Sequence, residues 1–206
     1  MQLQARSHLL ANLRVVGLCI GVLLGQPCSA QAILQKDGGT FSLFSGQDVS
    51  AWNQTGNANW RIHQQQLLAN QGAGTLVGRF PFVDFDFQII YAVDPLAQVS
   101  LFVHCSNPNE ISRDTAYQIN MSDSAVDGYG AGSLVGILNA PPIQTADRWN
   151  TLAIKGRQNK LSITLNGIVV ANELIVHRFP SGPIAIRYTS GDLAIKAMTA
   201  SIPGRW

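Results

Sequence analysis

Amide and imidazole side chains on three apolar runs are the first candidates for chemistry in this sequence. The runs 85–93, 99–105 and 116–121 alternate apolar residues with others, which is typical of strands that bury one face. Their other face would carry Gln88, His104, Gln118 and Asn120. If the three strands are adjacent, these four side chains form one polar patch. A solvated sheet face without a ligand is an equally good interpretation.

The sequence disfavours several other kinds of catalytic site. His63, His104 and His177 are not spaced from one another or from an acidic residue as a metal pair would be, so no metal is expected. The only glutamates are Glu110 and Glu173, too few for the paired-carboxylate strand of an ordinary glucanase. No Gly-x-Ser-x-Gly elbow presents a serine nucleophile, and we expect no cofactor.

Aromatic side chains are a second route to a sugar site, because they can stack on the C–H face of a pyranose. Tyr129 lies between glycines that cannot bury it, so it is a candidate for stacking, although a plain loop tyrosine is as good an interpretation. Trp60 and Trp149 begin apolar runs, so we expect both to pack in the core. For Trp52, the sequence leaves both core packing and sugar stacking open.

The first thirty residues resemble an export signal. Arg6 and Arg14 precede the apolar run 15–25, which is too short to span a bilayer, and a stretch of small residues follows. Cleavage after Ala30 or Ala32 fits, and Ala30 is preferred. We therefore expect a signal peptide over 1–30, one domain over 31–206, and a periplasmic or extracellular location.

Removal of that segment makes the chain electrically neutral. The full sequence has 14 basic and 12 acidic residues, and residues 1–30 include two arginines and no acid, so 12 of each remain. A neutral chain without a basic cluster lacks the electrostatic footprint for nucleic acid or an anionic membrane, and we expect neither as a partner. Cys105 is then the only cysteine left, so it cannot form an internal disulfide, and we expect a buried, unreactive thiol.

Strand-length runs separated by turn signals predict an all-β fold. The predicted strands are residues 40–44, 60–62, 66–68, 74–77, 85–93, 99–105, 116–121, 133–137, 149–155, 160–165, 168–173, 183–188 and 193–202. Asn166 and Gly167 predict a type I′ turn between two of them. No run has a helical period, and a dozen or so strands are typical of an antiparallel sandwich.

The order of several short motifs resembles the 3-keto-disaccharide hydrolase family, which has a concanavalin A-like jelly-roll sandwich. The matching stretches are residues 41–52, 60–62 with 67–68, 82–87, 147–151, 165–167 and 182–186. Three positions differ from the family pattern: His104 occupies the place of an arginine, Ala116 the place of a glutamate two residues before Gln118, and Val135 the place of a tyrosine in the stretch 132–136. The resemblance covers nearly the whole of the exported part.

The resemblance implies cleavage of a 3-keto-glycoside by elimination, followed by hydration of the resulting glycal. The C3 ketone acidifies the C2 hydrogen, so such a site needs a base and a donor to the enolate oxygen. Within this resemblance, His104 is the expected base, Gln118 and Asn120 are the expected donors, and Gln88 and Tyr129 complete the substrate-binding set. The partner would be a carbohydrate or an oxidised glycoside. Two alternatives stay open, a carbohydrate-binding module without turnover and a structural envelope protein.

Overall fold

The computed structural model describes residues 39–203, which fold into thirteen strands and no helix. The strands are β1 (Thr40–Phe44), β2 (Trp52–Gly56), β3 (Arg61–His63), β4 (Gln66–Ala69), β5 (Gly74–Gly78), β6 (Phe85–Val93), β7 (Gln98–Val103), β8 (Tyr117–Asn120), β9 (Arg148–Arg157), β10 (Lys160–Leu165), β11 (Ile168–Ile175), β12 (Ala185–Ser190) and β13 (Leu193–Ser201). The expected export signal lies outside the described residues. Within them, no helix has the length and apolar character needed to cross a membrane.

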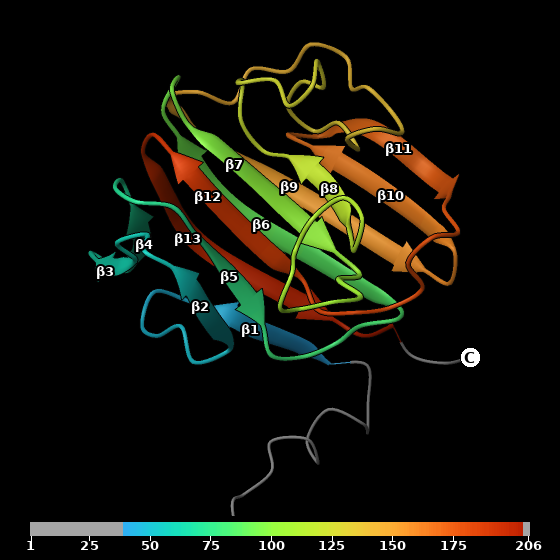
Figure 1. Ribbon diagram of the computed structural model, residues 1–206, viewed down its shortest axis with the longest axis horizontal. Helices are drawn as coiled ribbons and strands as arrows, with labels where there is room; N and C mark the ends of the chain where they lie inside the picture. Colours follow the sequence, from blue (N-terminus) through green and yellow to red (C-terminus); the bar gives the residue numbers. More distant parts are fainter. Residues whose placement is uncertain (1–38, 204–206) are drawn as a thin grey trace, which may run out of the picture. The chain divides into compact units, whose positions relative to one another are not determined.

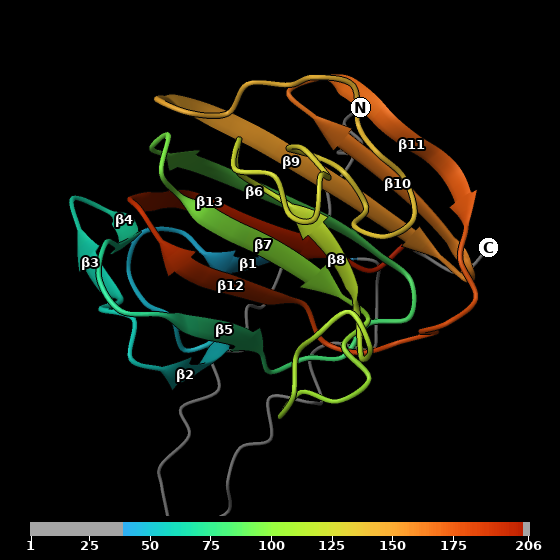
Figure 2. The same ribbon diagram turned by 45° about the horizontal axis from the view of Figure 1, so that its top comes forward.

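The strands form two antiparallel sheets packed face to face (Figures 1 and 2). The larger sheet has eight strands in the order β11-β10-β9-β6-β13-β4-β3, with β1 paired to β13. The smaller sheet has the order β2-β5-β12-β7-β8. The predicted all-β sandwich of the concanavalin A-like jelly-roll type is therefore confirmed.

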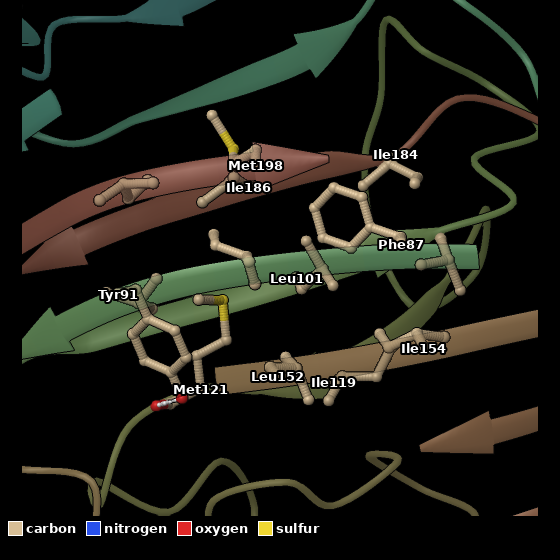
Figure 3. Packing of buried hydrophobic residues seen from close by; sticks show 14 of the residues in the cluster. Phe87, Tyr91, Leu101, Ile119, Met121, Leu152, Ile154, Ile184, Ile186 and Met198 are labelled. Carbon is tan, nitrogen blue, oxygen red and sulfur yellow. Dashed lines mark hydrogen bonds between the residues drawn. The ribbon is translucent and has the colours of Figure 1, made fainter. Parts of the chain in front are cut away.

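Alternating side chains of the two sheets fill the space between them, as the period of the sequence predicts. From the large sheet, Phe87, Tyr91 and Ile154 point inward, and they meet Leu101 and Ile119 of the small sheet (Figure 3). All five are at most 2% exposed. At about 25 cal/mol per Å² of apolar area, burial on this scale is the main stabilising contribution to a sandwich without disulfides.

Three local predictions differ from the structure. Residues 52–56 form a strand, β2, although only Trp52 among them is buried, and its Nε1 donates to the carbonyl oxygen of Leu43 (2.9 Å). Residues 133–137 form no strand but are held to β8 by the isolated bridge between Ile119 and Leu134. Trp149 is not in the core: it is 45% exposed on the outer face of the large sheet.

The β10–β11 hairpin gives a direct test of the turn prediction. Asn166 and Gly167 both have positive φ, 52° and 81°, as a type I′ turn requires. A Cβ at Gly167 would have no heavy atom within 4 Å, so space does not limit substitution there. Replacing Gly167 with valine should still lower the free energy of unfolding by about 1 kcal/mol or more, because a β-branched residue resists positive φ. Urea denaturation measures the change, and an unaltered midpoint would contradict the turn assignment.

Candidate functional site

A groove of about 420 Å³ runs along β8, the edge strand of the small sheet. It lies between β8, the segment that follows β11, and the loops that precede and follow β8. Its polar lining residues are Arg113, Asp114, Gln118, His177 and Arg178. Ile137 and Ile175, which are 51% and 58% exposed, add apolar surface. We call this space the β8 groove.

Gln118 belongs to β8 itself, and the strand fixes its position. Its backbone carbonyl accepts a hydrogen bond from the N–H of Val135 (2.9 Å), so the 133–135 segment extends the sheet beyond β8. Its side-chain amide donates to Ser100 Oγ on β7 (2.9 Å). The predicted binding residue Gln118 therefore lines the β8 groove, and its side chain is held by Ser100.

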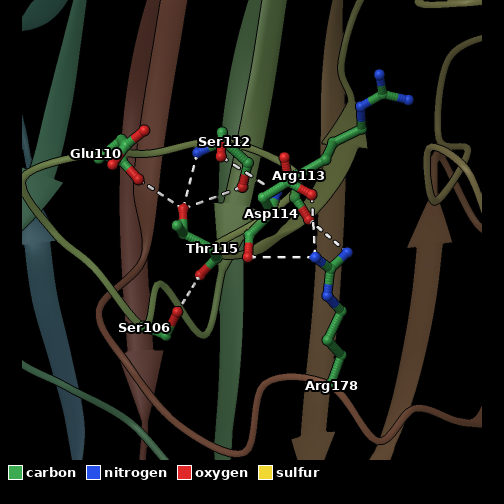
Figure 4. Close-up of polar contacts among 7 residues, drawn as sticks. All are labelled: Ser106, Glu110, Ser112, Arg113, Asp114, Thr115 and Arg178. Carbon is green, nitrogen blue, oxygen red and sulfur yellow. Dashed lines mark hydrogen bonds and ion pairs between the residues drawn. The ribbon is translucent and has the colours of Figure 1, made fainter.

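The loop before β8 supplies one wall of the groove and is held by its own hydrogen bonds (Figure 4). The Thr115 hydroxyl donates to the carbonyl oxygen of Glu110 (2.6 Å) and accepts from the N–H of Ser112 (3.0 Å). Arg178 then ties this loop to the segment after β11, because its guanidinium donates to the carbonyl oxygen of Arg113 (3.2 Å) and to the Asp114 carboxylate (3.0 Å). The Arg178 side chain thus joins the loop before β8 to the segment after β11, and both line the groove.

Tyr117 anchors the same segment from the core side. It points inward from β8, and its hydroxyl oxygen accepts hydrogen bonds from the backbone N–H groups of Arg178 (2.7 Å) and Phe179 (2.9 Å). The Arg178 guanidinium also lies 5.0 Å from the centroid of the Phe179 ring. These contacts fix the backbone that carries His177 and Arg178 against β8.

The groove presents two guanidinium groups whose ion pairs are exposed. Arg113 pairs with Asp127 (2.9 Å) and Arg178 with Asp114 (3.0 Å), and all four side chains are at least 49% exposed. Exposed pairs contribute little net free energy, so a ligand oxygen can compete for these donors. His177 is exposed beside them, and its one polar contact, with Asn159 Nδ2, is long at 3.5 Å. The arrangement can bind hydroxyl or carbonyl oxygens and can accept a proton.

His104 does not share the groove with Gln118, and the expected common face is wrong for it. Its φ of 55° interrupts the strand alternation and turns the ring to the core side, where it lies edge-on to Phe85 and Tyr117. The residue is 1% exposed. Nδ1 lies 2.9 Å from the carbonyl oxygen of Phe179 and Nε2 lies 3.0 Å from that of Val83, so both ring nitrogens face backbone. This geometry is that of a structural cross-link between three segments.

Burial governs the protonation of His104. Removal from water lowers the pKa of the imidazole below its ordinary value, and the two carbonyl oxygens together with the Asp84 carboxylate offset only part of this effect. A neutral ring has a single N–H and can donate to only one of the two carbonyl oxygens. Its other nitrogen faces the second carbonyl and not a space that a substrate could enter. His104 is therefore not placed to take a proton from a ligand in the β8 groove.

The other predicted binding residues lie apart from one another. Gln88 is exposed on β6, which belongs to the large sheet between β9 and β13, so the expected adjacency with β7 and β8 is wrong. Asn120 is buried, and its amide donates to the carbonyl oxygens of Ser124 (3.0 Å) and Tyr129 (2.9 Å). Tyr129 is half-buried in the loop that follows β8 and does not line the β8 groove. Asn120 thus shapes the loop that follows β8.

A second, smaller apolar cluster covers the outer face of the small sheet beside the groove. Ile111 from the loop before β8 joins Phe102, Cys105 and Ala116 there, and the Arg187 guanidinium lies 4.8 Å from the centroid of the Phe102 ring and donates to the carbonyl oxygen of Ile111. Burial of Cys105 is confirmed, and it raises the pKa of the thiol to about 12. This cluster therefore covers part of the outer face of the small sheet next to the β8 groove.

Arg113, His177 and Arg178 were not predicted, because they lie in loops without a periodic pattern. The one available signal in the sequence was that an imidazole and a guanidinium, His177 and Arg178, come directly after a predicted strand. Within residues 39–203, no group of three or more His, Cys, Asp or Glu side chains is arranged to hold a metal ion.

Comparison with known sequences decides the family. A family profile described as 3-keto-alpha-glucoside-1,2-lyase-like domain matches residues 39–200. The chain belongs to this family. The resemblance inferred from the ordered motifs is thereby confirmed. A search of curated protein sequences gives no match.

Solved structures of low identity share the fold of this 3-keto-alpha-glucoside-1,2-lyase-like domain. Two candidate glycosyl hydrolases from Parabacteroides distasonis superpose with TM-scores of 0.64 and 0.62 at 12% and 16% identity, each over 81% of this chain and over 95% and 100% of theirs. The carbohydrate-binding module CBM66 from Bacillus subtilis has a TM-score of 0.53 at 12% identity, over 74% of this chain and 97% of its own. At these identities the similarity concerns the fold.

The departures from the family pattern can now be placed. Ala116, at the position of the family's glutamate, lies at the edge of the β8 groove beside Gln118, and its side chain is buried with Phe102 and Ile111. The groove therefore runs along the strand where the sequence resemblance implies a glutamate and a glutamine. In this chain, glutamine remains and the carboxylate is replaced by a methyl group.

Proposed function

We propose that this protein binds a saccharide in the β8 groove. The observation that carries the proposal is that Gln118, on the strand where the family places its functional residues, lines one groove with the guanidinium groups of Arg113 and Arg178. Amide and guanidinium donors suit the hydroxyl and carbonyl oxygens of a sugar. Ile137 and Ile175 offer contact to its C–H surface.

The family and the structural neighbours support a carbohydrate ligand over other small molecules. The family is that of 3-keto-alpha-glucoside-1,2-lyase-like domains, and the neighbours include candidate glycosyl hydrolases and a carbohydrate-binding module. An oxidised glycoside adds a ketone oxygen that two guanidinium groups can bind. Export to the periplasm or beyond, as the first thirty residues suggest, would bring the groove into contact with extracytoplasmic sugars.

His177 favours a second candidate function, the elimination reaction itself. The imidazole accepts the C2 hydrogen as a proton, and the C–H electron pair forms the C2=C3 enolate, whose oxygen takes hydrogen bonds from Arg113 and Arg178. The enolate then restores the C3 ketone, forms the C1=C2 bond and expels the C1 substituent as an oxyanion, which takes the proton back from the His177 imidazolium and leaves as the neutral aglycone. Water adds across C1=C2 afterwards. His177 takes the place in this scheme for which sequence reasoning favoured His104.

Calorimetry with p-nitrophenyl 3-keto-glucosides of both anomers, followed by assay of p-nitrophenol release, tests both functions. Gln118→Ala should weaken binding about fivefold to tenfold through the loss of one oriented amide, whereas Gln54→Ala, at the opposite edge of the same sheet, should bind like the wild type. Binding without release selects the binding module, and release selects the lyase. Absence of binding for both anomers would contradict the proposal.

A further inference from the structure

A second groove lies on the outer face of the large sheet, away from β8. Its volume is about 430 Å³, and its polar lining residues are Arg61, Asn70, Asp94, Asp147 and Asp192. Its floor includes Ala92 of β6 and Ala194 of β13. None of these residues takes part in the β8 groove.

Strand register places an exposed tryptophan at one end of this floor. Trp149 is paired with Ala92, Ala92 with Ala194, Ala194 with Leu68, and Leu68 with Arg61. The row therefore crosses five neighbouring strands, β9, β6, β13, β4 and β3, which is a span of about 19 Å at the usual strand spacing. We call it the Trp149–Arg61 row.

The side chains of the row form a trough that has an aromatic ring at one end and a hydrogen-bond donor at the other. Trp149 is 45% exposed, and Ala92, its neighbour on β6, is too short to cover its indole. At the far end, the Arg61 guanidinium is oriented by the side-chain oxygen of Asn70, to which it donates (2.8 Å), and Asn70 is in turn held by Asn59. The exposed Lys196 approaches the indole, with Nζ 5.8 Å from the ring centroid. A flat aromatic surface, a small-residue floor and an oriented donor are thus aligned.

Charge decides which class of ligand fits. Three carboxylates border the trough against the guanidinium of Arg61 and the ammonium of Lys196, so an anionic ligand would meet excess negative charge. A protein partner would need a larger apolar centre, whereas Trp149 is the only large exposed apolar side chain of the row. Carboxylates, an amide and a guanidinium are suited to hydroxyl groups, and an indole is suited to the C–H face of a pyranose.

We propose that the Trp149–Arg61 row binds an uncharged oligosaccharide, with one sugar stacked on Trp149 and the next units lying over Ala92 and Ala194 toward Arg61. The site is independent of the β8 groove, because the two occupy different sheets and share no residue. The protein then holds an oligosaccharide chain on one sheet while the β8 groove on the other takes its own ligand.

Titration of ¹⁵N-labelled protein with cellotriose, maltotriose and xylotriose tests this site, with trigalacturonic acid as the anionic counterpart. We expect a neutral trisaccharide to shift the Trp149 indole N–H resonance. Trp149→Ala should weaken binding at least about tenfold through loss of the stacking surface, and Ala92→Leu, which fills the floor and keeps the indole, should do the same. Ala153→Leu makes the same change on the same face outside the trough and should leave the affinity unchanged.

The Gln118→Ala variant separates this proposal from the one for the β8 groove. It should bind the neutral trisaccharide at the row as the wild type does, whatever its affinity for a 3-keto-glucoside. The proposal is overturned if none of the three neutral probes shifts the indole resonance at about 10 mM, or if trigalacturonic acid binds more tightly than all of them. Equal affinity of the wild type and Ala92→Leu would overturn it as well.

Discussion

His177→Ala is expected to slow the release of p-nitrophenol from a p-nitrophenyl 3-keto-glucoside about a hundredfold, because loss of a general base typically has an effect of that size. His177 is the exposed imidazole of the β8 groove, beside the guanidinium groups that would bind the enolate oxygen. The decrease should appear in kcat, since proton transfer occurs only after the substrate is bound. Single-turnover measurements of release give that rate directly.

Two controls distinguish a base from a residue that shapes the groove. His63→Ala removes another exposed imidazole, on β3 of the large sheet, and should leave the rate unchanged. Added imidazole should restore part of the rate of His177→Ala, because a small base can occupy the vacated space. A fully active His177→Ala protein would rule out this assignment, and a slow variant that imidazole does not rescue would favour a positioning role.

The buried faces of the strands could be predicted because they depend on a local pattern. Alternation at period 2 assigned Phe87, Leu101 and Ile119 to the core, and all three are buried there. The same rule applied to β9 would also have placed Trp149 correctly: Leu152 and Ile154 face inward, so odd-numbered positions of that strand face out. For predicting whether Trp149 is buried, its alternation with Leu152 and Ile154 was a better guide than its position at the start of an apolar run.

The partners of each strand could not be predicted in the same way, because a local pattern does not say which strands lie side by side. Gln88 and Gln118 have similar patterns around them, yet β6 and β8 belong to different sheets. The β8 groove depends on this topology and on two loops, and the loops bring Arg113 and Arg178 to β8 through contacts across 60 or more residues of sequence. The family motifs identified the strand of Gln118 but not its neighbours in space.

His104 shows a different limit, since one backbone angle reversed the direction of its side chain. Alternation from Val99 to Val103 is regular, and continuing it by one step places His104 opposite Val103. The left-handed φ of His104 ends that regularity, and its ring enters the core while Cys105 joins Phe102 on the outer face. Histidine is among the residues that tolerate this region, but residues 103–106 contain no glycine or Asn-Gly pair that would predict a positive φ.

His104→Ala should lower the free energy of unfolding by about 3 kcal/mol at pH 7.5, because it empties a buried site and leaves one of the two carbonyl oxygens, of Val83 or Phe179, without its donor. The wild-type protein should in addition lose stability on acidification. Above the ordinary histidine pKa of about 6.5, the ring is neutral in the folded and the unfolded chain. Below it, the unfolded chain binds a proton that the folded chain, with its lowered pKa, does not, so falling pH favours unfolding.

The loss should approach about 1.4 kcal/mol for each pH unit below 6.5, until the folded state also takes up the proton. Urea denaturation of the wild type and of His104→Ala at pH 7.5 and 5.5 measures it. The difference between the two proteins should shrink at the lower pH, because the variant lacks this titration and is otherwise identical to the wild type. A difference that grows on acidification would mean that the two carbonyl oxygens outweigh burial and hold the ring as an imidazolium, with both nitrogens donating.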